Sequence, residues 1–158
     1  MRKLAIAIST VATALMAALM AATPAGATPP SAVSGTETIT GATATVVRTA
    51  DGNTILANTL TGTIAGSFTG TFTADFTTIV HPSGQTNVMN GTFNCTCSIA
   101  ARSGSVTFRF EGTGTPSATA IHAETIGATG GLLGLHSNVT VVVVGAAATY
   151  SGIAHFDP

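Results

Sequence analysis

The sequence predicts an all-β protein, and its simplest arrangement is an eight-stranded antiparallel closed β-barrel, with a β-sandwich as the alternative. Its 158 residues include 30 threonines and 18 glycines, whereas only 7% are charged and 5% are aromatic. Threonine is β-branched and favours strands, and glycine disfavours helices. Turn residues recur about every 10 to 15 residues, as in all-β chains. The central runs pair one apolar face with one threonine-rich face, which indicates a sheet with its core on one side.

Residues 1–27 have the order of a secretory signal peptide. Arg2 and Lys3 provide a positive start, residues 4–22 are uncharged and mainly apolar, and a small-x-small site ends at Ala27. We therefore expect cleavage after Ala27 and a secreted, extracytoplasmic protein. A retained membrane anchor is the alternative, which the hydroxyl residues inside the apolar stretch disfavour.

The remaining 131 residues are expected to hold one domain. Residues 28–35 contain two prolines and are predicted to be a short tether, and residues 36–158 are predicted to be the barrel. This part has three arginines, no lysine and six carboxylates. Binding of nucleic acid needs clustered cations, so no nucleic-acid partner is expected. A membrane-spanning barrel needs aromatic girdles, and the chain has no Trp and one Tyr, so no membrane partner is expected after cleavage.

Each strand is predicted from the turn residues that bound it. The first four expected strands, each ending at the turn signal given with it, are 36–49 (Asp51-Gly52), 53–65 (Gly66), 67–81 (Pro82-Ser83-Gly84) and 85–101 (Ser103-Gly104). The last four are 104–114 (Thr115-Pro116), 117–127 (Gly130-Gly131), 137–145 (Gly145) and 147–156, which ends the chain.

The alternation of side chains predicts which residues face the core. In the three central strands the phenylalanines share a face with small or aliphatic residues, and the other face carries mostly Thr, Ser and Asn. We expect the apolar faces to line the lumen and to bind a ligand there through Phe68, Phe72, Phe76, Phe93, Phe108 and Phe110.

Cys95 and Cys97 are the only cysteines, and they share the face of Phe93 and Ile99. An even count in a secreted chain indicates a possible disulfide. However, residues i and i+2 of a flat strand lie about 6.6 Å apart, at the long end of disulfide geometry. Two free buried thiols are the second interpretation. A metal site is the third, but it would need two further ligands, and no trusted spacing supplies them, so no metal is expected.

His122 and Glu124 are the catalytic candidates. They share one face of an expected strand with two alanines, whose small side chains would leave room for a ligand if that face lined the barrel. His122 would then act as an acid or base, oriented by Glu124. The alternative is that this face points to solvent. The opposite face is no more polar, so the pattern does not decide.

Three stretches resemble a bacterial family of small barrels, mostly of unknown function, that is related to allene oxide cyclase and dirigent proteins. They are IVHPSG at 79–84, ARSGSVTFRFEGTG at 101–114 and GATGGLLGL at 127–135. The resemblance spans about residues 36–156 and involves turn and packing residues. It implies an eight-stranded antiparallel barrel with a largely apolar lumen. Relatives with known activity are isomerases or cyclases that fold a flexible apolar substrate, and none of their catalytic residues matches a position in this chain.

These observations predict a secreted barrel that binds a small apolar molecule in its lumen without a cofactor. An isomerase or cyclase of the same architecture is the first alternative, because holding a substrate in a reactive conformation needs few polar groups. A structural or surface-interaction protein with a filled barrel is the second. The volume and lining of the interior distinguish the three.

Overall fold

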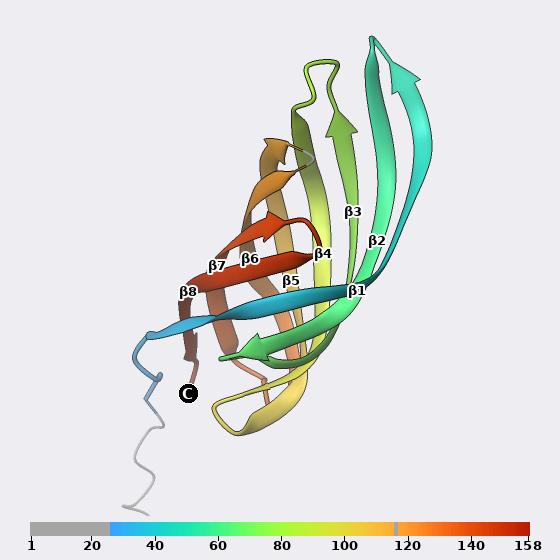
Figure 1. The fold of residues 1–158 in the computed structure, drawn as a ribbon. Coiled ribbons are helices and arrows are strands. Elements are labelled where there is room, and N and C mark those ends of the chain that lie inside the picture. Colours follow the sequence, from blue (N-terminus) through green and yellow to red (C-terminus); the bar gives the residue numbers. More distant parts are fainter. Residues whose placement is uncertain (1–25, 116) are drawn as a thin grey trace, which may run out of the picture.

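The computed structural model describes residues 26–115 and 117–158, which form eight β-strands joined by short turns (Figure 1). In chain order the strands are β1 (Ser31–Ala50), β2 (Asn53–Gly66), β3 (Thr69–Val80), β4 (Thr86–Ile99), β5 (Arg102–Thr115), β6 (Ala118–Gly130), β7 (Leu135–Val144) and β8 (Ala147–Phe156). The all-β prediction is confirmed. Within the two described ranges, no helix has the length and apolar character needed to cross a membrane. The expected signal peptide lies outside the described residues, except for its last two positions.

The strands form a ring. Each strand pairs antiparallel with its neighbours in the chain, and β1 pairs antiparallel with β8. This last contact joins residues 31–38 to residues 147–154. One continuous sheet therefore curves back on itself, in place of the two facing sheets of a sandwich.

The ring is not equally tall on all sides. After Thr38, strand β1 leaves β8 and continues to Ala50 paired with β2, so the β1–β2 hairpin projects beyond β8 (Figure 1). Register shifts at Ile39/Gly41 and Val46/Arg48 accompany the projection, as expected for bulges that bend a strand. The hairpin closes at Asp51 and Gly52, both with positive φ, at the predicted Asp-Gly turn.

Residues 28–35 do not form a free tether. Strand β1 begins at Ser31, five residues before the predicted start, and pairs with β8 from there. Ahead of the strand, the Thr28 N–H donates to the Phe156 carbonyl at 2.9 Å. The two prolines stand just before the strand, where they remove no hydrogen bond from the ladder. The strand therefore extends into the predicted tether because β8 offers it a free edge.

One turn lies elsewhere than predicted. Ile99 pairs with Arg102, so β4 and β5 are joined by Ala100 and Ala101, with φ of 50° and 63°, and not at Ser103-Gly104. Such angles favour Gly or Asn, which explains why two alanines gave no turn signal. Gly104 has a packing role instead, because a Cβ there would lie 2.0 Å from the Thr129 carbonyl oxygen of β6.

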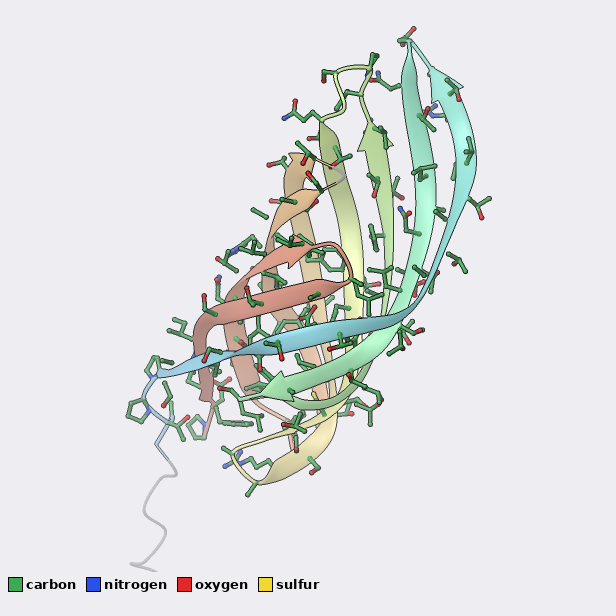
Figure 2. All side chains as sticks on the ribbon, viewed as in Figure 1. Atoms are coloured by element: carbon green, nitrogen blue, oxygen red, sulfur yellow. The ribbon has the colours of Figure 1, made fainter. Side chains whose placement is uncertain are left out.

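The predicted register of the central strands is confirmed. Phe72 and Ala74 of β3 are 5% and 4% exposed, whereas Thr71 on the same strand faces solvent. Figure 2 shows side chains crowded inside the part of the ring that β8 closes, while those of the projecting hairpin stand apart. The core therefore fills the closed part of the ring.

Candidate functional site

The interior of the ring holds a cavity of about 70 Å³. A single water molecule needs about 10–15 Å³, so side chains do not fill the interior completely. All eight strands contribute to the lining, and within residues 26–115 and 117–158 every lining side chain is a hydrocarbon except those of Glu37 and Tyr150. The cavity can therefore hold a few apolar atoms beside one carboxyl and one hydroxyl group.

Aromatic rings form much of the wall. Phe72 stacks on Phe93 at 4.6 Å between ring centroids, and Phe108 meets Phe68 edge-on at 5.9 Å. Of the six phenylalanines predicted to bind a ligand, five line the cavity: Phe68, Phe72, Phe93, Phe108 and Phe110. Phe76 does not. Its ring packs against that of Phe110 at 5.6 Å, towards the projecting end of the sheet.

Glycines make room for these rings. A Cβ on Gly91 of β4 would lie 2.3 Å from Cζ of Phe110, and one on Gly62 of β2 would lie 2.6 Å from Cζ of Phe72. Each ring therefore lies so close to a strand backbone that a side chain on the glycine would clash with it. This placement depends on pairing between strands, so neither glycine stood out in the sequence.

Glu37 is the charged residue of the site, and sequence reasoning missed it. It lies on β1 between Thr36 and Thr38, within the stretch that pairs with β8, and its side chain reaches the cavity wall. Burial raises the pKa of its carboxyl from the ordinary 4.5 to about 7. Charged carboxylates lose favourable hydration in apolar surroundings, so the proton is held more tightly. The alternation of side chains along the strand could have predicted the inward position of Glu37. It shares a face with Val33 and Ile39, while threonines occupy the other face.

Tyr150 of β8 supplies the second polar group. Its hydroxyl oxygen accepts a hydrogen bond from the buried Phe68 N–H at 2.8 Å, and burial raises the pKa of the phenol. A Cβ on Gly35 would lie 2.4 Å from this oxygen. The backbone at the turn between β2 and β3 thus holds the Tyr150 hydroxyl in place. Glu37 is then the polar lining group that carries no such hydrogen bond among the described residues.

Cys95 and Cys97 are buried, as the alternation predicts, and both are free thiols. The possible disulfide between them is therefore not formed in this structure, in agreement with the wide spacing of i and i+2 positions on a strand. Their mutual hydrogen bond and burial raise the pKa of the Cys95 thiol. The described residues bring together no cluster of three or more His, Cys, Asp or Glu side chains suited to a metal ion.

His122 and Glu124 point away from the lumen, which corrects the catalytic interpretation. His122 is exposed, and Glu124 forms an ion pair on the outer surface with Arg109. The inward face of β6 carries Ile121 and Ala123 instead, and both line the cavity. The partly buried Ile121 and the buried Ala123 take the inward positions in place of the two polar side chains, since buried charges need partners.

Comparison with solved structures supports the fold. The chain is similar to a protein of unknown function from the DUF3224 family of Shewanella oneidensis MR-1, with 17% identity and a TM-score of 0.70 over 82% of this chain and all of the other. It is also similar to an enzyme from Penicillium herquei, with 18% identity and a TM-score of 0.54 over 80% of this chain and 96% of the other.

At these identities the likeness concerns the fold alone. No family model matches the chain, and no curated protein matches its sequence. The molecule therefore belongs to the class of small all-β proteins whose strands form a ring, and its function has to be argued from the cavity.

Proposed function

We propose that this protein is exported, is cleaved after Ala27, and binds a small, mainly apolar molecule inside its ring of strands, which works as a closed barrel. The observation that carries the proposal is the apolar cavity of about 70 Å³. Apolar ligands gain about 25 cal/mol for each Å² of surface removed from water. A preformed cavity also spares the protein the cost of opening one when the ligand arrives.

Filling the cavity by mutation tests this function. Ala123 is 6% exposed and lines the cavity, so Ala123→Leu would place additional carbon atoms inside it. Ala120 lies on the same strand but faces solvent, so Ala120→Leu is the matched control. We expect toluene, followed by NMR titration, to bind the wild type and Ala120→Leu but not Ala123→Leu. Circular dichroism confirms that both variants fold, since overpacking costs about 1–3 kcal/mol. Failure of the wild type to bind toluene would refute the proposal.

A second function is favoured by Glu37. A carboxyl group whose pKa is about 7 can both donate and accept a proton near neutral pH. Together with the resemblance to allene oxide cyclase relatives, this supports isomerisation or cyclisation of an apolar substrate, with Glu37 in the role first assigned to His122. Native mass spectrometry of the secreted protein would identify a co-purifying ligand. Incubation of that ligand with the protein in D₂O should then place deuterium on carbon, and Glu37→Gln should abolish this exchange.

A further inference from the structure

Glu37 is a carboxyl group without a partner in the part of the chain that the structure describes. Among the described residues it takes part in no ion pair and no hydrogen bond through its side chain. Within the two described ranges, the cavity lining contains no Arg or His. Arg109 is occupied by Glu124 on the outer surface, and Arg102 lies over the Phe156 ring at 4.1 Å. Ionised, Glu37 is therefore a half-buried charge beside a mainly apolar cavity, and the described residues do not neutralise it, which is costly.

The wall around this carboxyl suits a cation. Five phenylalanine rings and Tyr150 line the same cavity. The faces of aromatic rings carry negative charge density and attract ammonium groups, more strongly where water is excluded. After cleavage of the expected signal peptide the chain has six carboxylates against three arginines, so its overall field also favours cations.

We infer that the ligand is a small apolar amine, whose protonated nitrogen pairs with the Glu37 carboxylate while its hydrocarbon part lies against the phenylalanine rings. This inference rests on the proposed binding function and specifies its ligand class. Folding has already removed part of the water around the half-buried carboxylate, so the arriving ammonium loses mainly its own hydration and neutralises an existing charge. A neutral ligand of the same shape would leave that charge uncompensated, and an anionic one would add to it.

Binding should then depend on the ionisation of Glu37. Strand β2, on one side, carries no titratable residue. Strand β8, on the other, carries Tyr150, whose pKa is raised by burial, and His155, whose ring stacks on that of His136. On β4, Cys95 interacts electrostatically with Glu37 and has a raised pKa, whereas the hydrogen bond with Cys95 lowers the pKa of Cys97. A change in affinity around pH 7 that Glu37→Gln removes is thereby assigned to Glu37 and to none of these groups.

Three ligands of similar shape test the inference: benzylamine, benzyl alcohol and toluene. Their affinities are measured by NMR titration or calorimetry at about pH 8.5 and about pH 5.5, on either side of the Glu37 titration. At the higher pH benzylamine should bind about tenfold or more tighter than the other two, as a charge-assisted hydrogen bond predicts. At the lower pH this preference should shrink towards equality. Glu37→Gln should remove both the preference and its pH dependence, while Glu111→Gln, which changes an exposed carboxyl group, should preserve them.

The possible binding results distinguish a wrong ligand class from a wrong binding function. If none of the three molecules binds, the proposed binding function is wrong. If all three bind equally at both pH values, the function stands and the amine inference is overturned. A preference for benzyl alcohol at the lower pH would show that protonated Glu37 recognises a neutral polar group, which also overturns it. An amine preference that survives in Glu37→Gln would place the cation elsewhere and refute the role of Glu37.

Discussion

Glu37→Gln should make the protein more stable at and above neutral pH while leaving its stability in acid little changed. The carboxyl has an ordinary pKa of 4.5 and a pKa of about 7 in the folded protein. Each pH unit between two such values corresponds to about 1.4 kcal/mol, so holding the ionised carboxylate in the cavity costs the native state about 3 kcal/mol. Glutamine has a similar shape and no charge, so this cost disappears.

The direction in which stability changes with pH follows from the number of protons that the native and unfolded states bind. Between pH 4.5 and about 7 the native state keeps the Glu37 proton while the unfolded state has released it. Unfolding then releases a proton, so wild-type stability falls as the pH rises through this window. Below the window both states are protonated, and above it both are ionised, so the difference between wild type and variant becomes constant at each end.

Urea denaturation at a series of pH values measures this effect. The free energy of unfolding of Glu37→Gln minus that of the wild type should grow by about 3 kcal/mol from about pH 4 to about pH 8. Glu111→Gln is the matched control, because Glu111 is exposed, and it should show no comparable growth. A difference that stays constant over the whole range would refute the burial of Glu37 and with it the polar side of the cavity.

Three further predictions concern the register, the thiols and the mature terminus. Phe72→Ala should lower the free energy of unfolding by about 3–5 kcal/mol, against about 0.5 kcal/mol or less for the exposed Thr71→Ala; equal losses would contradict the register. A thiol reagent should label neither Cys95 nor Cys97 quickly in the folded protein but both after denaturation without reductant, because both are buried and free; rapid labelling of the native state would place them outside. N-terminal sequencing of the exported protein should begin at Thr28, and a product that keeps residue 1 and sediments with membranes would indicate an anchor.

Much of the fold could be predicted because it depends on local rules. Thr-rich alternation identifies strands and their buried faces, since successive side chains of a strand point to opposite sides. This rule placed Phe72 and Cys95 inside correctly. Asp51-Gly52 was recognised as a turn because these residues accept positive φ at little cost. The turn at Ala100-Ala101 was missed, since alanine carries no such signal and adopts these angles only because the paired strands require it.

In the candidate site, too, local patterns predicted some residues, and strand pairing determined the others. The apolar wall followed from alternation, whereas His122 and Glu124 were misplaced because both faces of β6 are equally polar in sequence. Only the pairing of β6 with β5 and β7 turned Ile121 and Ala123 inward. Glu37 resembled one more surface charge until the pairing of β1 with β8 carried it into the wall.

By itself, then, the sequence determined the strands, the buried face of the central sheet and the scarcity of polar groups in the core. All of these follow from residue preferences and from the twofold alternation along a single strand. Tertiary structure alone decided that β1 meets β8, that glycines receive the rings of Phe72 and Phe110, and that a space remains between the strands with one carboxyl group in its wall. Those features depend on contacts between residues distant along the chain, as in the pairing of Glu37 with Ala148, and local patterns carry no information about such distances.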